Sequence, residues 1–129
     1  MEAKLNIVAS WINTPFAIGG RIKGHKADCL APLIDLKKKF LYIPDYIISG
    51  NYHSIPHSAT EVKQAFDQEF KEIAGLEIGL FCFAHDIPHI GYLNSYKGTI
   101  IHSYQAAGRF VEHRFCSFFK NKLINTYRV

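Results

Sequence analysis

Residues 76–86 have the sequence LEIGLFCFAHD, and this most apolar stretch of the chain decides which fold the sequence predicts. A buried helix and a buried strand both fit such a run, because periodicity alone does not separate them. Eleven residues is long for a strand, so we expect a central helix here. The helix would end at His85 and Asp86, which places a titratable pair beside a buried segment.

The segments that precede this stretch predict two further helices. Residues 3–12 fit a short helix that ends before Pro15, because the residue before a proline avoids helical backbone angles. Residues 13–30 contain several glycines and scattered charges, which indicate a loop. Another helix is expected to begin at Pro32, and apolar residues then recur at helical spacing until Pro44 ends the run.

Residues 58–74 form the clearest amphipathic pattern of the sequence. Ser58 and Glu61 have the spacing of a capping box, and Gly75 is a suitable helix end. Residues 87–98 predict a loop, and residues 99–120 return to helical spacing. Since no period-two strand is evident, the sequence predicts an all-α fold, a single HD-domain-like helical bundle.

The size of the chain limits it to one domain. It has 129 residues, of which 48% are hydrophobic, enough for one buried core but not for two. We therefore expect a single domain over residues 1–129, with an N-terminal fragment of a longer catalytic domain as the alternative.

Net charge and cysteine content limit the classes of partner and the cellular compartment. The net charge is +4 without long basic runs, which favours a small phosphate-bearing ligand over a nucleic-acid duplex. Three scattered cysteines without a CxxC motif are typical of a reducing compartment. The sequence has neither an apolar run of about 18 residues nor a signal peptide, so no membrane partner and a cytoplasmic location are expected.

Four of the seven histidines fall into two tight groups. The first is His53-x-x-x-His57, and the second is His85-Asp86-x-x-His89 at the end of the apolar stretch. A buried carboxylate is costly unless it is paired or bound to a metal, and imidazole and carboxylate both bind divalent metals well. Together, the two groups predict a metal site.

Residues 51–94 resemble the HD-domain metal-dependent phosphohydrolases, and among these the 3′,5′-cyclic nucleotide phosphodiesterases. That group has the pattern Y-H-N-x-x-H-A, followed by H-D-x-x-H-x-G-x-x-N. Residues 52–58 are YHSIPHS, which matches the tyrosine and both histidines of the first motif. Residues 85–94 are HDIPHIGYLN, which matches all five defined positions of the second.

The resemblance implies a metal-dependent phosphohydrolase that cleaves a phosphodiester such as a cyclic nucleotide. A metal-activated hydroxide would attack the phosphorus, and His53 would protonate the leaving oxygen as general acid. The tighter metal, Zn or Fe, would be held by His57, His85 and Asp86, with Mg or Mn at the second site.

Three further residues have supporting roles under the same resemblance. His89 corresponds to a histidine of the second shell near the second metal, and Asn94 to a residue that shapes the site loop. His102 opens the last predicted helix and is a candidate to face the site. His113 has no partner pattern and is expected to be a surface or packing residue.

The family places a further aspartate downstream, whereas Glu112 is the only acid after Asp86 in this chain. A fragment of a longer enzyme is one explanation. Another is a minimal domain that completes its site with Glu112, His102, water or a partner subunit in a homo-oligomer. The third is a degenerate domain that binds metal or nucleotide as a sensor or scaffold. A rival enzyme class is a zinc protease, which requires an unbroken helix through His89.

Overall fold

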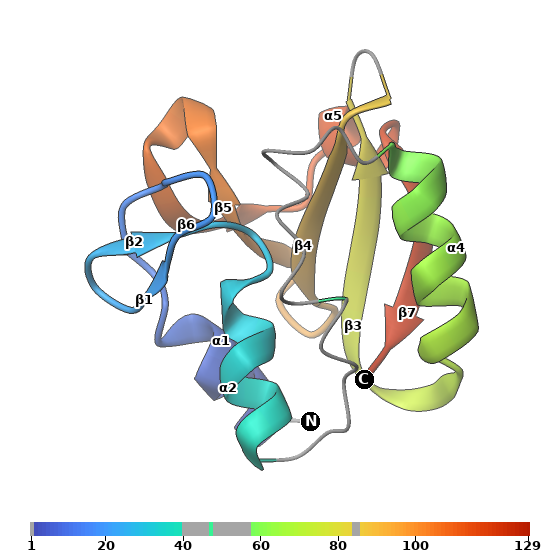
Figure 1. The fold of residues 1–129 in the computed structure, drawn as a ribbon, viewed down its shortest axis with the longest axis horizontal. Helices are drawn as coiled ribbons and strands as arrows, with labels where there is room; N and C mark the ends of the chain where they lie inside the picture. Colours follow the sequence, from blue (N-terminus) through green and yellow to red (C-terminus); the bar gives the residue numbers. More distant parts are fainter. Residues whose placement is uncertain (1, 40–46, 48–57, 84–85) are drawn as a thin grey trace.

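The computed structural model describes residues 2–39, 47, 58–83 and 86–129. The prediction of an all-α bundle is wrong, because a five-stranded antiparallel sheet forms the centre of the molecule (Figure 1). Its strands are β3 (Glu72–Cys82), β4 (Pro88–Asn94), β5 (Thr99–Tyr104), β6 (Arg109–Arg114) and β7 (Leu123–Arg128). Their spatial order is β6-β5-β4-β3-β7, a meander closed by β7 beside β3.

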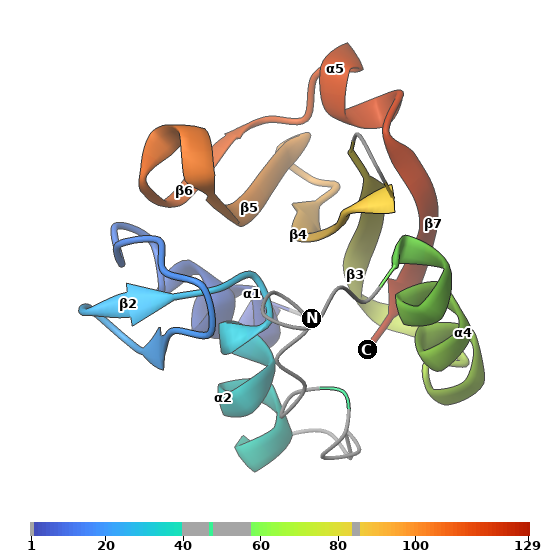
Figure 2. The same cartoon turned by 45° about the horizontal axis from the view of Figure 1, so that its top comes forward.

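Short helices cover both faces of the sheet (Figure 2). The larger core joins one sheet face to α1 (Glu2–Ala9), α2 (Ala31–Lys39) and α4 (Ala59–Glu69). On the other face, a smaller core includes Phe119 of α5 (Ser117–Lys120). A small hairpin of β1 (Arg21–Ile22) and β2 (Lys26–Ala27) precedes α2, and the 3-10 turn η2 (Gln105–Ala107) joins β5 to β6. None of the helices in the described ranges is long and apolar enough to cross a membrane.

The apolar stretch at residues 76–86 is the centre of a strand rather than a helix. β3 lies between β4 and β7, and it contributes Ile78 and Leu80 to the larger core and Phe81 to the smaller one. A strand buried on both faces loses the alternation of polar and apolar residues, which explains why the sequence pattern was ambiguous. Length then favoured the wrong alternative, because β3 is unusually long for a strand.

The predicted helix over residues 99–120 is also wrong, as is the loop over 87–98. Residues 88–94 are strand β4, and the later segment divides into β5, η2, β6 and α5. Gly98 and Gly108 have φ angles of 66° and 72°, and they lie in the turns before β5 and before β6. Apolar residues of β5, which is buried on both faces, and of β6 together imitated helical spacing here.

The N-terminal half agrees better with the sequence. α1 and α2 lie where helices were predicted, and α4 begins after Ser58, whose side-chain oxygen accepts the Glu61 N–H at 3.1 Å. This helix ends at Glu69, so the prediction that it continues to residue 74 is wrong. β3 starts at Glu72 instead.

Candidate functional site

Three histidines from neighbouring strands form a chain of hydrogen bonds on the sheet face that carries α5. His89 Nε2 on β4 lies 2.6 Å from His102 Nδ1 on β5, and His102 Nε2 lies 2.8 Å from His113 Nε2 on β6. His113 Nδ1 lies 2.8 Å from the backbone oxygen of Arg114. We call His89, His102 and His113 the imidazole chain.

The hydrogen positions in the imidazole chain follow from the acceptor at its outer end. A carbonyl oxygen only accepts, so Nδ1 of His113 carries its proton, and neutral His113 accepts at Nε2. His102 then donates from Nε2 and accepts at Nδ1, which requires His89 to donate from Nε2. In neutral His89, the lone pair that binds a proton is therefore on Nδ1.

The centre of the imidazole chain is dry and electrically neutral. His102 is fully buried, and the rings of Tyr104 and Phe119 lie 5.1 Å from it. Burial, followed by repulsion from His89 and His113, lowers the pKa of His102 to about 2. A neutral histidine with both nitrogens hydrogen-bonded transmits orientation to His89 without carrying charge itself.

The loop from Ala27 to Leu30 lies against the same two strands on the opposite face. The Tyr92 hydroxyl on β4 donates to the Cys29 oxygen at 2.8 Å, and the Ser103 hydroxyl on β5 donates to the Ala27 oxygen at 2.8 Å. His102 and Ser103 are consecutive on β5, so they point to opposite faces of the sheet. These bonds hold the backbone at Ala27 and at Cys29, a buried thiol two residues before the first residue of α2.

Charged and titratable groups surround Cys29. The Asp28 carboxylate accepts the Leu30 N–H at 3.0 Å and pairs with the Arg21 guanidinium at 3.1 Å. Burial, with the negative charges that Cys29 and Asp28 can carry, raises the pKa of Tyr92 well above its ordinary value. Tyr92 is thus a neutral hydroxyl donor, and it holds the backbone of Cys29.

Cys29 and His89 share one strand as their neighbour. His89 is the second residue of β4 and therefore lies at the rim of the sheet. Tyr92, which binds Cys29, is three residues further along the strand, roughly 10 Å away at the usual rise. His89 points to the opposite face from Tyr92, where it packs against Phe81 and Phe83, so the sheet separates its imidazole from the Cys29 thiol.

The site predicted from the histidine motifs is only partly described. His53, His57 and His85 lie outside the described residues. Asp86 is exposed at a φ of 60°, and its carboxylate is 3.9 Å from Cys82 Sγ. Within residues 2–39, 47, 58–83 and 86–129, no group of three or more histidine, cysteine or acidic side chains is arranged to hold a metal.

The three residues to which the resemblance gave supporting roles, His89, Asn94 and His102, do not all lie together. His89 and His102 are brought together, as hydrogen-bonded partners. Asn94 closes the turn after β4, where its side-chain oxygen accepts the N–H groups of Tyr96 and Lys97. The helix expected to end near Asp86 is absent, because β3 ends at Cys82.

Sequence reasoning missed the contacts of Tyr92 and His113. His113 was expected to be a surface or packing residue, and it packs against Phe119 while both its ring nitrogens form hydrogen bonds. No sequence signal marks Tyr92, since only the folded chain brings it to Cys29.

No family model matches this chain, and no curated protein matches it significantly.

Proposed function

We propose that this protein is a hydrolase in which His89 is the general base that activates water. The observation that carries this proposal is the 2.6 Å hydrogen bond between His89 Nε2 and His102 Nδ1, because it fixes the ring of His89 at the rim of the sheet. His102 has the role of the residue that orients the base. Cys29 is buried in the larger core on the opposite face of the sheet, so its thiol takes no part in this reaction.

The substrate class is an ester or amide with an accessible acyl carbon. His89 takes a proton from water, and the resulting hydroxide bonds to the acyl carbon to form a tetrahedral intermediate. The imidazolium then gives the proton to the leaving oxygen or nitrogen as its bond to the acyl carbon breaks. The products are the carboxylic acid and the alcohol or amine, and the imidazole is neutral again.

Metal-dependent phosphohydrolysis stays a prediction of the sequence, because His53, His57 and His85 of its predicted site lie outside the described residues. Both ring nitrogens of His102 are engaged with other imidazoles, which leaves neither for a metal. The zinc-protease alternative is wrong, because it requires a helix where β4 runs as a strand from Pro88.

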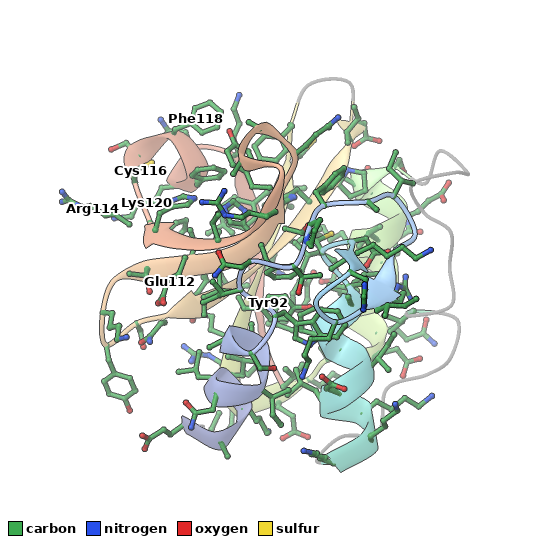
Figure 3. The ribbon with its side chains drawn as sticks, turned by 90° about the vertical axis from the view of Figure 1, so that its left-hand side faces the viewer. Tyr92, Glu112, Arg114, Cys116, Phe118 and Lys120 are labelled. Carbon is green, nitrogen blue, oxygen red and sulfur yellow. The ribbon has the colours of Figure 1, made fainter. Side chains whose placement is uncertain are left out.

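The experiment compares His89→Gln with His25→Gln, a matched control at an exposed histidine. Hydrolysis of p-nitrophenyl acetate is followed for both variants. We expect His89→Gln to lose about 100-fold or more of the hydrolysis rate and His25→Gln to keep it. Cys29→Ser should keep the rate, as should Cys116→Ser on the exposed α5 side of the molecule (Figure 3).

A chelator separates the two functions. Hydrolysis that depends on His89 is expected to persist in EDTA. Full activity of His89→Gln, or loss of the hydrolysis in Cys29→Ser, would refute the proposal. Metal-dependent hydrolysis of bis-p-nitrophenyl phosphate that is lost in His57→Ala would instead support the phosphohydrolase.

A further inference from the structure

Positive charge is concentrated in the last third of the sequence. Residues 87–129 contain six lysines and arginines and one acidic residue, whereas residues 1–86 contain nine basic and ten acidic residues. With neutral histidines, the last third therefore has a net charge of +5, and the remainder of the chain has a net charge of −1. Such a charge asymmetry between two parts of a chain favours an anionic ligand on the basic part.

Two of these cations line a hollow of about 260 Å³ where β6 leads into α5. The lining residues are Arg114, Phe115, Cys116, Ser117 and Lys120, and Figure 3 shows the labelled ones among them at one corner of the molecule. We call this site the basic hollow. Pockets for drug-sized ligands have volumes of roughly 300–1,000 Å³, so the basic hollow has the size for a smaller ligand.

The two cations of the basic hollow are not neutralised by the described residues. Arg114 and Lys120 are exposed, and neither belongs to an ion pair in the described part of the chain. Glu112, the one acid of this region, accepts a hydrogen bond from the Thr99 hydroxyl at 2.6 Å. Lys120 Nζ lies 5.7 Å from the centre of the Phe115 ring, which holds the ammonium group beside the hollow. Two positive charges thus face one small volume.

We infer that the basic hollow binds the phosphate group of a small phosphate ester. The planar guanidinium of Arg114 can donate two parallel hydrogen bonds to phosphate oxygens, and the Lys120 ammonium and Ser117 hydroxyl supply further donors. A phosphate monoester has a charge of about −1.5 to −2 at pH 7, which matches two cations better than the single charge of a carboxylate does. The inference does not depend on the proposed hydrolase, because no lining residue belongs to the imidazole chain.

Titration of ¹⁵N-labelled protein with inorganic phosphate and with glycerol 3-phosphate tests the inference. The ionic strength is held constant with chloride, because salt screens exposed charges. We expect saturable shifts of backbone amide signals centred on residues 114–120. Arg114→Gln and Lys120→Gln should each weaken binding about fivefold, the upper end of the range for an exposed ion pair. Circular dichroism melting verifies that each variant is folded.

Lys122→Gln is the matched control for Lys120→Gln. Lys122 is also exposed, and its Nζ lies 5.9 Å from the centre of the Phe118 ring, but it does not line the basic hollow. The control therefore removes the same charge two residues further along the chain, and we expect it to bind phosphate as the wild type does. Equal weakening by Lys120→Gln and Lys122→Gln would overturn the inference, since the overall charge alone would then explain the binding. Absence of saturable shifts in the wild type would overturn it as well.

Vesicles distinguish a soluble phosphate ester from a lipid headgroup. The protein is sedimented with phosphatidylcholine vesicles that contain phosphatidic acid, and Arg114→Gln is compared with the wild type. Binding to these vesicles that is lost in Arg114→Gln would identify the lipid as the source of the phosphate. Binding of glycerol 3-phosphate without binding to the vesicles would identify a soluble ester, and binding of neither would overturn the inference.

Discussion

The neutral state of buried His102 makes the stability of the fold depend on pH. Burial lowers its pKa in the folded state from 6.5 to about 2, so the unfolded chain binds a proton below pH 6.5 that the folded chain does not. Keeping His102 neutral therefore does not lower the free energy of unfolding at neutral pH. Below pH 6.5, it lowers the free energy of unfolding by about 1.4 kcal/mol for each pH unit. Between pH 7 and pH 4.5, the free energy of unfolding should fall by about 2.5 kcal/mol because of this residue alone.

His102→Gln tests this magnitude, because glutamine has a similar size and does not titrate. Urea unfolding at pH 7 and pH 4.5 is followed by the fluorescence of Trp11, the one tryptophan of the chain, which is buried. Other groups that titrate contribute equally to both proteins, so the comparison isolates His102. We expect the variant to lose about 2.5 kcal/mol less than the wild type on acidification.

The matched control is His25→Gln, which removes an exposed histidine that belongs to neither core. Equal losses of stability in the wild type and in His102→Gln would refute the reasoning. That result would mean that His102 is already charged or solvated in the folded protein, and the direction of the imidazole chain would no longer follow.

Two further predictions concern the backbone. Gly75→Ala should destabilise the fold by about 3 kcal/mol or more, because the φ of Gly75 is 124° and a Cβ would lie 2.4 Å from the Val129 oxygen. Gly98→Ala should destabilise it by about 1 kcal/mol, because Gly98 has a φ of 66° but open space around it. Equal melting temperatures for the two variants would contradict this. Ser58→Ala removes the N-cap of α4 and should cost about 1 kcal/mol in urea unfolding, while Gln64→Ala on the same helix should cost less than half of that.

The fold was predictable from the sequence where local signals were sufficient. The capping serine of α4 and the proline near the start of α2 act within one or two turns of chain, and both helices lie where they were expected. The sheet was missed because β3, β4 and β5 each bury both faces, and such strands have no polar alternation. The turns at Gly98 and Gly108 were the available sign that residues 99–120 do not form one helix.

The candidate site likewise combines residues that local sequence patterns indicated with residues that only the folded chain brings together. Sequence spacing drew attention to His89 and His102 through a resemblance that implied a helical fold, and the structure joins them as neighbours on two strands. His113 belongs to no local motif. It became part of the candidate site only because strand pairing brings β6 beside β5.

The sequence by itself determined the helices of the N-terminal half, the apolar centre at residues 76–86, and the concentration of histidines that marks a site. Only the tertiary structure decided that this centre is a strand, because burial on both faces comes from neighbours that lie far apart along the chain. The direction of the imidazole chain is likewise a tertiary property. It depends on hydrogen bonds between three strands and on one backbone carbonyl, and the order of residues in the sequence specifies neither.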